Sequence, residues 1–564
     1  MSLLRVPVGH DAERWRTFQG TRTLVVAART VTSAVRVLEV LPALLRGDGR
    51  VTVVVAHDPT SAFGDGVSEL LRAEGCRVMP WEQLDGLAPD LVLSASENID
   101  LPEGDCPVLV LPHGVGFQKR VPDSRSARTR LSGVVPDSLL ATGRAWLAVS
   151  HPDQEEQLLA SHPLAAGRTL LVGDPCYDRL RAGLARRAAY RRALRVADDQ
   201  RLVVVSSTWG PTSLLGRDPQ LPARLLAELP LDEYRVAAIT HPNVWSGHGS
   251  WQIRTLQAAA LEAGLLLIPP ERGWQPTLVA ADAVVGDHGS VTLYGAALGK
   301  PVLLATVGSD SEPGTAMAEL SRTAPRLAGG EPLRAQLDRA VREHTPGRYA
   351  GITDRAFAEP DQALARLRTA LYGLLRLPEP GPAAAPALAY PPPEQRSAPV
   401  TSALVHTAVD RVAGQWSVTV RRHPAAVAGE PGVEGPLAEG AGAYVHLACD
   451  EEEPDQRLTG SASVLLRRRP AGTAVAGVRW VRETLESFPG SLLAAVPVDG
   501  GCLAGLRDGR IVEAAATGPA ADPGLSAAVV YACLRAALPL DDTVVTLRVG
   551  GRRQDVALRV RPSL

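Results

Sequence analysis

The sequence predicts an α/β protein in which two Rossmann-like, doubly wound domains face a cleft and a small β-rich domain follows them. Uninterrupted apolar strands alternate with helical segments twice along the chain, and after residue 400 the pattern changes to a two-residue alternation. The length of 564 residues also exceeds what one hydrophobic core normally organises. We therefore divide the chain into residues 1–165, 166–376, 377–400 and 401–564.

The first domain is predicted from strands whose apolar residues run without polar alternation. These strands cover residues 22–28, 50–58, 89–96, 106–114 and 144–152. Helical spacing lies between them at 33–47 and 66–75, and Gly47 and Gly75 end those two helices. Continuous apolar strands are typical of a parallel sheet that is covered on both faces.

The second domain repeats this pattern. It is expected to begin with a strand at 168–175, which an arginine-rich helix at 178–196 follows. Its further strands are predicted at residues 201–210, 234–243, 264–271, 281–290 and 300–308. Two doubly wound domains in series bring the carboxyl ends of both sheets to one cleft, which is where such folds bind ligands.

The rest of the chain differs in composition. Residues 377–400 are rich in Pro and Ala without helical or strand periodicity, which predicts a semi-rigid linker. Beyond it, two-residue alternation predicts a small β-rich or α+β accessory domain, with strands at 415–422, 443–450, 461–469, 543–551 and 555–562.

Composition excludes several classes of partner. Lys and Arg number 59 and Asp and Glu 61, so no overall positive field attracts nucleic acid. The six cysteines form no C-x-x-C pair and have no histidine at zinc-finger spacing, so we expect reduced thiols and neither a metal nor a cofactor. The N-terminal residues lack the apolar stretch of a signal peptide, and no apolar run is long enough for a membrane span. We expect a cytoplasmic protein, or at most a peripheral one at the inner face of the membrane.

Polar residues end three predicted strands of the second domain. A helix is expected to begin at Ser290, its N-cap, where free N–H groups favour a phosphate that Gly289 lets approach closely. The candidate donor-binding residues are Ser207, Thr208, Trp209, Asp287, His288, Gly289 and Ser290, and His241, at the end of another strand, is a candidate catalytic residue. Each alone is compatible with an ordinary strand-to-helix turn or a structural histidine. Their convergence on one cleft favours a site for a nucleotide diphosphate.

A histidine ends a strand of the first domain. His113 follows the strand at 106–114, and an unperturbed pKa of about 6.5 lets it accept a proton at neutral pH. Gly114 is expected to leave room for a substrate. A basic run follows, either as a binding site for a polyanionic acceptor or as a solvated loop. Its residues are Lys119, Arg120, Arg125, Arg128 and Arg130, of which Lys119 and Arg120 are the candidate acceptor contacts.

Five motifs in order resemble those of a known family. They are "HGVGFQK", "GDPCYDRL", "SSTWGP", "THPN" and "GDHGSVTLYGAALGKP", within residues 100–306. This order is similar to that of the CDP-glycerol glycerophosphotransferase family, the teichoic-acid-type polymerases of GT-B architecture. The chain departs from the family pattern at three positions. Gly289 stands where the family has serine, His288 where it often has tyrosine, and Gly210 where it has arginine.

The resemblance implies an activity and roles for individual residues. His113 matches the proposed base, His241 the histidine that contacts the donor phosphate, and Ser290 a serine of the donor-binding turn. The implied reaction transfers an alditol phosphate from a CDP-activated donor to a hydroxyl acceptor, lipid-linked or not, in cell-envelope polymer synthesis. In that reaction His113 deprotonates the acceptor, and CMP leaves while His241 and the helix N-terminus at Ser290 stabilise its charge.

Two other readings remain open. A UDP-sugar-dependent GT-B glycosyltransferase or a UDP-N-acetylglucosamine 2-epimerase also has an acid–glycine–serine turn before a helix and an "LGKP" sequence. The H-G motif with its following lysine favours the phosphotransferase. The other reading is a non-catalytic GT-B scaffold that binds nucleotide or a protein partner, and the presence of both His113 and His241 argues against it.

Overall fold

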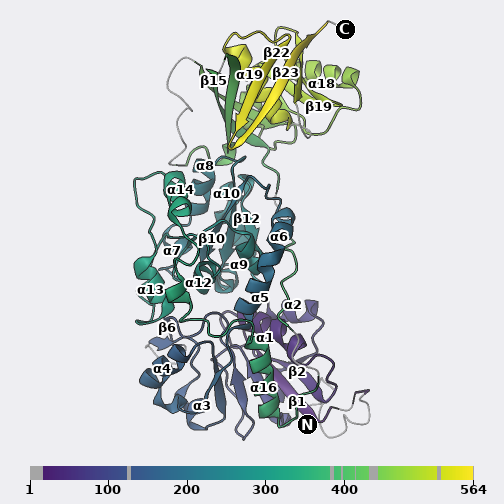
Figure 1. The fold of residues 1–564 in the computed structure, drawn as a ribbon. Coiled ribbons are helices and arrows are strands. Elements are labelled where there is room, and N and C mark those ends of the chain that lie inside the picture. The colour runs from purple at the N-terminus through teal and green to yellow at the C-terminus, as the bar shows by residue number, and fades with distance from the viewer. Residues whose placement is uncertain are drawn as a thin grey trace.

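The computed structural model describes residues 17–18, 20–123, 129–381, 386–394, 398–412, 414–430, 442–516 and 522–562. Residues 1–16 of the N-terminal segment 1–18, which lacks the apolar stretch of a signal peptide, lie outside this part, as do Arg125 and Arg128 of the basic run. The described chain forms three units that follow one another along the molecule, with the first lobe at one end and the C-terminal unit at the other (Figure 1). No helix in the described ranges has the length and apolar character needed to cross a membrane.

The first lobe is built on a parallel sheet. Within residues 20–123 and 129–171 seven strands pair in the order β3-β2-β1-β4-β5-β8-β9. They are β1 (Arg22–Ala28), β2 (Val51–His57), β3 (Val78–Pro80), β4 (Leu91–Ser94), β5 (Val108–Val110), β8 (Ala145–Val149) and β9 (Thr169–Leu171). Every neighbouring pair is parallel, and the order reverses between β1 and β4, so the predicted doubly wound sheet is confirmed.

Helices and one small ribbon complete the first lobe. The helices are α1 (Val31–Leu44), α2 (Val67–Ala73), α3 (Asp137–Ala141) and α4 (Pro152–Ser161). The ribbon joins β6 (Arg120–Pro122) to β7 (Thr129–Leu131) in antiparallel pairing.

The strand expected to open the second domain belongs to the first. Residues 169–171 form β9, which pairs with β8 in parallel register through the crossover helix α4. An apolar run shows that a strand is buried, but it does not show which sheet the strand joins. The chain therefore passes into the second lobe a few residues later, at α5 (Pro175–Gly183).

The second lobe repeats the architecture. Within residues 201–304 five parallel strands pair in the order β12-β11-β10-β13-β14. They are β10 (Arg201–Ser207), β11 (Tyr234–Thr240), β12 (Leu266–Ile268), β13 (Ala283–Gly286) and β14 (Val302–Leu304). The helices around them are α6 (Arg187–Ala193), α7 (Leu214–Arg217), α8 (Leu221–Glu228), α9 (Pro242–Leu256), α10 (Ala258–Glu262), α11 (Trp274–Ala280), α12 (Ser290–Ala297), α13 (Ala316–Thr323), α14 (Leu333–Glu343) and α15 (Ala350–Thr353).

The last helix before the linker packs on the first lobe. In α16 (Ala363–Leu375), Leu367 and Leu371 are fully buried in the same apolar cluster as α1 and β1. Figure 1 shows α16 beside α1, far from the sheet of the second lobe. The division of the chain at residues 165, 376 and 400 stays a prediction, and α16 returns to the first lobe within the segment assigned to the second.

The predicted linker is anchored rather than loose. Its Tyr390 is buried, and the Tyr190 hydroxyl donates to the Tyr390 carbonyl oxygen over 2.6 Å. The Arg179 guanidinium lies 3.8 Å from the centre of the Tyr390 ring. The Tyr390 hydroxyl donates to Glu39 of α1 over 3.3 Å, so this residue touches both lobes.

The C-terminal unit is a closed barrel, which confirms the predicted β-rich character. Over the described residues after 398, nine strands pair in the closed order β15-β16-β22-β23-β21-β20-β19-β18-β17. They are β15 (Ser402–Val412), β16 (Gln415–Pro424), β17 (Ala443–Asp450), β18 (Val464–Leu466), β19 (Leu493–Val498), β20 (Gly501–Leu506), β21 (Ile511–Ala516), β22 (Thr543–Val549) and β23 (Arg552–Arg561). Helices α17 (Gln456–Ser461), α18 (Ala474–Ser487) and α19 (Pro523–Arg535) accompany them. Residues of α19 share one apolar core with the strands.

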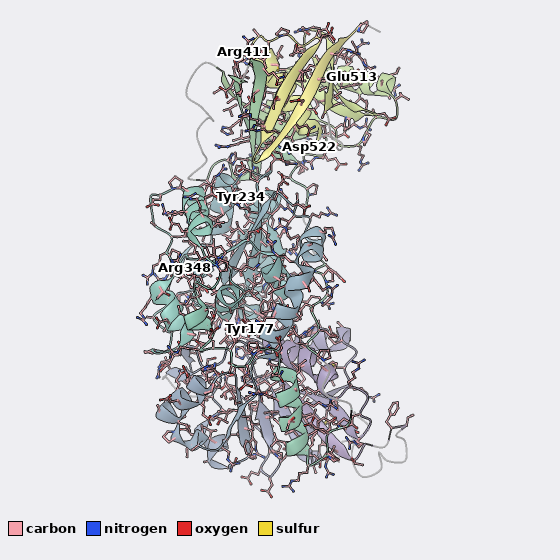
Figure 2. All side chains as sticks on the ribbon, viewed as in Figure 1. Tyr177, Tyr234, Arg348, Arg411, Glu513 and Asp522 are labelled. Atoms are coloured by element: carbon pink, nitrogen blue, oxygen red, sulfur yellow. The ribbon has the colours of Figure 1, made fainter. Side chains whose placement is uncertain are left out.

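Arg422 joins the barrel to the second lobe. Its guanidinium lies 2.7 Å from Asp232 of the second lobe and 2.8 Å from Asp522 of the barrel. Asp522 lies at the end of the barrel that faces the second lobe (Figure 2). We expect Arg422→Met to lower the free energy of unfolding by at least about 1.5–3 kcal/mol, the value of one hydrogen bond to a charged group, because three such bonds to Asp232 and Asp522 are lost. Urea denaturation measures this, and the exposed Arg553→Met is the matched control. Equal stability of the two variants would contradict the prediction.

Two buried histidines make the barrel sensitive to acid. Burial lowers the pKa of His423 to about 4 and that of His446 to about 3, and His406 adds to both shifts. Because these pKa values lie below the usual value of about 6.5, the two histidines bind more protons in the unfolded chain than in the folded one at pH values between the folded pKa and 6.5. The contribution of these histidines to the free energy of unfolding is therefore fully present above pH 6.5. Below that pH, each histidine lowers the free energy of unfolding by about 1.4 kcal/mol per pH unit. Denaturation at pH 7 and 5 should show a smaller loss in His423→Gln/His446→Gln, whereas the exposed His248→Gln should keep the wild-type loss.

Candidate active site

A cavity of about 430 Å³ lies between the two lobes. Its walls come from the loops after β1, β4 and β5 of the first sheet and from those after β10, β11 and β13 of the second. In both sheets the strand order reverses at this place, between β1 and β4 and between β10 and β13. Doubly wound folds bind their ligands at such switch points, so this cavity is the candidate active site.

His113 lines the cavity with a defined tautomer. Its Nδ1 lies 3.3 Å from the carbonyl oxygen of Ala95, which can only accept a hydrogen bond. Nδ1 therefore carries the hydrogen, and Nε2 keeps its lone pair. Burial lowers the pKa of His113 below its usual value, and the Glu97 carboxylate opposes this shift only in part. The ring is neutral at pH 7 and suited to accept a proton.

His241 has the opposite tautomer. It caps the N-terminus of α9, where the backbone N–H of Asn243 donates to its Nδ1 over 3.1 Å. The neutral ring therefore carries its hydrogen on Nε2. Burial lowers the pKa of His241 well below its usual value, and the charge of Lys119 adds to this, as does that of His113 when it is protonated. Both rings line the same cavity, where His241 offers a hydrogen-bond donor and His113 offers an acceptor.

Lys119 reaches across to the second lobe. Its Nζ donates to the Thr208 hydroxyl over 3.1 Å and lies 5.5 Å from the centre of a Trp209 ring. Burial lowers the pKa of Lys119, while Asp310 and Asp287 oppose that shift. Lys119 was expected to contact the acceptor. The structure places it among the residues expected to bind the donor.

Arg120 does not line the cavity, and its role as an acceptor contact stays a prediction. Its side chain is 48% exposed and pairs with Glu312 over 2.8 Å. Arg120 begins β6, and successive side chains of an extended segment point to opposite sides. Because of this alternation, the side chains of Arg120 and Lys119 point to opposite sides of the chain.

Asp287 connects the loops after β10 and β13 of the second lobe. It is fully buried and accepts hydrogen bonds from the backbone N–H groups of Thr208, Leu214 and Gly289, over 2.8, 2.9 and 3.0 Å. Burial raises its pKa, which His288 and these three bonds oppose. Asp287 was predicted to bind the donor, but it is not among the residues that line the cavity. It holds the loops after β10 and β13 together.

Two further predicted donor contacts, His288 and Ser207, already have polar partners within the second lobe. Nδ1 of His288 accepts from the Gly308 N–H over 3.0 Å, and Nε2 lies 3.0 Å from Asp310. The Ser207 hydroxyl donates to the Thr208 carbonyl oxygen and accepts from the Leu215 N–H. Both side chains border the cavity, but their polar atoms already have protein partners.

The two lobes touch at Gly114 and Ser290. The N-cap of α12 is Gly289 rather than Ser290, and the Ser290 hydroxyl accepts from the Val115 N–H of the first lobe over 3.2 Å. A Cβ on Gly114 would lie 2.7 Å from that hydroxyl oxygen. Gly114 therefore lets the lobes approach each other, where room for a substrate was expected. Gly289 likewise permits a close approach to Thr208: a Cβ on Gly289 would lie 3.2 Å from the Cβ of Thr208.

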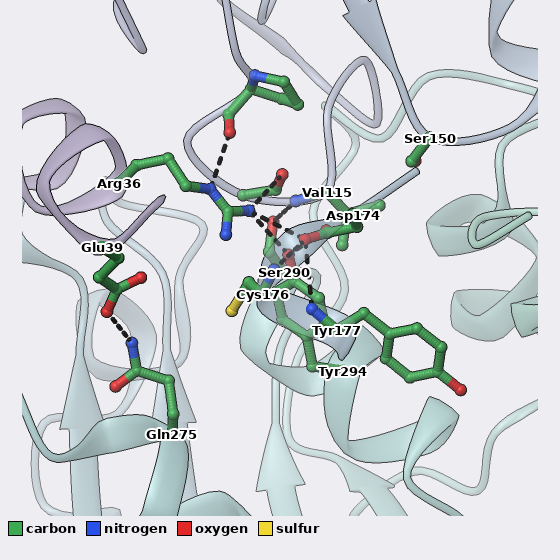
Figure 3. Close-up of polar contacts among 12 residues, drawn as sticks. Arg36, Glu39, Val115, Ser150, Asp174, Cys176, Tyr177, Gln275, Ser290 and Tyr294 are labelled. Atoms are coloured by element: carbon green, nitrogen blue, oxygen red, sulfur yellow. Dashed lines mark hydrogen bonds and ion pairs between the residues drawn. The ribbon is translucent and has the colours of Figure 1, made fainter. Parts of the chain in front are cut away.

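Sequence reasoning missed a buried network that supports the His113 loop. Arg36 of α1 donates to the carbonyl oxygens of Pro112 and Gly114, over 3.0 and 3.4 Å. Its guanidinium also lies 3.3 Å from Asp174, which accepts from the Tyr294 hydroxyl of α12 over 2.5 Å (Figure 3). An arginine on the apolar face of a predicted helix was the signal, since such a charge must find a buried partner.

Glu97 was missed as well. It follows β4, and its Oε2 lies 3.9 Å from Nδ1 of His113. Its Oε1 pairs with Arg130 over 2.8 Å. The signal was a carboxylate directly after the buried strand at 89–96.

The predicted absence of a metal and of a cofactor stays a prediction. Among the residues that the structure describes, no three His, Cys, Asp or Glu side chains are grouped so that they could hold a metal ion.

Comparison with known proteins gives structural likenesses alone. No protein-family model and no curated protein matches the chain. A variant of the wall teichoic acid polymerase TagF matches with a TM-score of 0.43 and 12% identity, over 63% of this chain and 89% of that one. The MnaA–UDP structure from S. aureus has a TM-score of 0.38 and 12% identity, over 64% and 100%. UDP-GlcNAc 2-epimerase from Neisseria meningitidis, bound to UDP-GlcNAc, has a TM-score of 0.38 and 14% identity, over 63% and 100%.

The family that the motifs resemble is represented among these structures. So is the epimerase that was kept as an alternative. At such identities and TM-scores the likenesses do not decide between the two. The choice of function rests on the residues of the cavity.

Proposed function

We propose that the chain is a GT-B transferase that moves a glycerol-phosphate-type group from a CDP-activated donor to a hydroxyl acceptor in cell-envelope polymer synthesis. The observation that carries the proposal is the pair of opposite tautomers, with His113 as acceptor and His241 as donor in one cavity. The motif resemblance supports the class of donor. Lys119 adds a cation beside Thr208, where a diphosphate would need one.

In this mechanism Nε2 of His113 removes the proton of the acceptor hydroxyl. The resulting oxygen attacks the outer phosphorus of the CDP-alditol and forms a new P–O bond. The bond between that phosphorus and the bridging oxygen breaks, and the electron pair leaves with CMP. The Nε2–H of His241 and the ammonium of Lys119 stabilise the negative charge that develops on the phosphate oxygens.

A second candidate is a UDP-sugar glycosyltransferase or an epimerase, and Gly210 is the observation that favours it. Gly210 has a φ of 89°, a conformation that side chains other than glycine rarely adopt. The chain thus has a glycine where the glycerophosphotransferase pattern has an arginine, and it lacks the cation that this arginine would offer a CDP-alditol.

Nucleotide preference tests the proposal. Isothermal titration calorimetry of the whole chain with CDP, UDP and ADP should show the tightest binding for CDP. Preference for UDP would favour the glycosyltransferase or epimerase. Binding of none of the three at millimolar concentration would leave the non-catalytic scaffold as the best account.

His241 should contribute directly to nucleotide affinity. We expect His241→Ala to weaken CDP binding by about 1.5–3 kcal/mol, because a hydrogen bond to a charged phosphate oxygen is lost. Calorimetry measures this change. The matched control is His248→Ala, which removes an exposed histidine from the same helix. Equal affinity of the two variants would remove His241 from the donor site.

A further inference from the structure

We propose that Glu97 is the positioning residue of His113. Its carboxylate orients the ring and stabilises the positive charge that the ring acquires with the proton of the acceptor, and Arg130 holds the carboxylate in place. This inference rests on the proposed role of His113 as the base.

The strands bring the residues together. β4 and β5 are parallel neighbours, with Ser94 opposite Val110, so the loops that carry Glu97 and His113 leave the same edge of the sheet. The loop after β4 is fixed by Ser94, whose hydroxyl accepts from the N–H of Ser96 and donates to its carbonyl oxygen. The N–H of Leu111 in turn donates to the carbonyl oxygen of Ser94, which ties the two loops together. The Ala95 carbonyl and the Glu97 carboxylate therefore face the same nitrogen of His113, Nδ1.

The carboxylate is held in its charged form. Burial alone would raise the pKa of Glu97, but the charge of protonated His113 and the charge and hydrogen bond of Arg130 outweigh that effect, and the pKa lies below its usual value. Glu97 is buried and Arg130 lies 2.8 Å from its Oε1, which leaves Oε2 toward the ring. A fixed negative charge at this place favours the imidazolium and keeps Nε2 directed at the substrate.

The other charged groups around His113 act against its protonation. Besides burial, which is the largest cause, Lys119 and Arg36 lower the pKa of His113. Glu97 is the group that opposes them, since its charge raises the pKa of the same ring. Without it, the base would be weaker and its protonated form would be less stable.

A merely structural role is the competing explanation. Glu97 could serve only to neutralise Arg130. In that case its replacement would change the stability of the lobe but not the titration of His113. The titration therefore separates the two explanations.

The test uses Glu97→Gln in the whole chain, with Glu103→Gln, an exposed residue of the same lobe, as control. We expect kcat to fall by about 10²-fold with little change in KM, because a contribution to general base catalysis is lost. The acidic limb of the pH profile of kcat/KM should move to lower pH. NMR of labelled histidine nitrogens, assigned with His113→Gln, should show the same shift for His113 without substrate.

Two outcomes are decisive. A His113 titration that is the same in Glu97→Gln and in the wild type would overturn the inference. A wild-type chain without turnover would count against the proposed function, whereas the ring titration would still decide the role of Glu97. If Glu97→Gln does not fold, Glu97→Asp replaces it: the charge is kept at a greater distance, so a smaller shift in the same direction is expected and no shift would contradict the inference.

Discussion

Replacing His113 by alanine is expected to lower kcat by about 10²–10⁴-fold, the usual contribution of a general base. The affinity for the nucleotide should change little, because the proposed donor contacts Thr208 and His241 come from the second lobe. Steady-state kinetics and calorimetry on the same preparation measure both quantities. His248→Ala, which removes an exposed histidine, is the control. Turnover by His113→Ala at the wild-type rate would exclude His113 from the mechanism.

Replacing Arg36 by methionine is expected to cost about 3–5 kcal/mol of unfolding free energy, because the partner Asp174 stays buried without its cation. Arg36 also holds the carbonyl oxygens of Pro112 and Gly114, which flank His113. Activity should therefore fall at temperatures where the variant is still folded. Urea denaturation and kcat measure the two effects.

Two other variants separate the effect of Arg36 from that of a lost arginine in general. Arg46→Met removes an exposed arginine just beyond the same helix and should behave as the wild type. Arg36→Lys keeps the charge but not the planar fork, so an intermediate loss is expected. If Arg36→Met is as stable and active as Arg46→Met, the network does not support the site.

The strand ends were predictable because periodicity and turn residues are local properties. The loop after β13 and the histidines after β5 and β11 were found in this way, and all three reach the cavity. The contacts of the individual side chains in these loops could not be predicted in this way. Asp287 and His288 have the residue types of a ligand site, yet neighbouring loops use up their polar atoms.

Contacts between the lobes could not be predicted from local pattern. Asp174 lies 138 residues after Arg36, and nothing in either segment alone indicates the pairing. Gly114 was interpreted as space for a substrate because its neighbour Ser290 lies on another domain. Lys119 and Arg120 are both basic, and only the direction of the extended chain sends one into the cavity and the other to Glu312.

The nucleotide product tests the central claim most directly. Transfer of an alditol phosphate breaks the diphosphate and releases a nucleoside monophosphate, whereas sugar transfer from a UDP-sugar releases a nucleoside diphosphate. The whole chain would be incubated with CDP-glycerol or with UDP-N-acetylglucosamine, each with glycerol phosphate as soluble acceptor, and the nucleotides separated by anion-exchange chromatography. The proposal predicts CMP from CDP-glycerol, little of it with His113→Ala, and no UDP from the UDP-sugar. Release of UDP, or no CMP above the His113→Ala level, would contradict it.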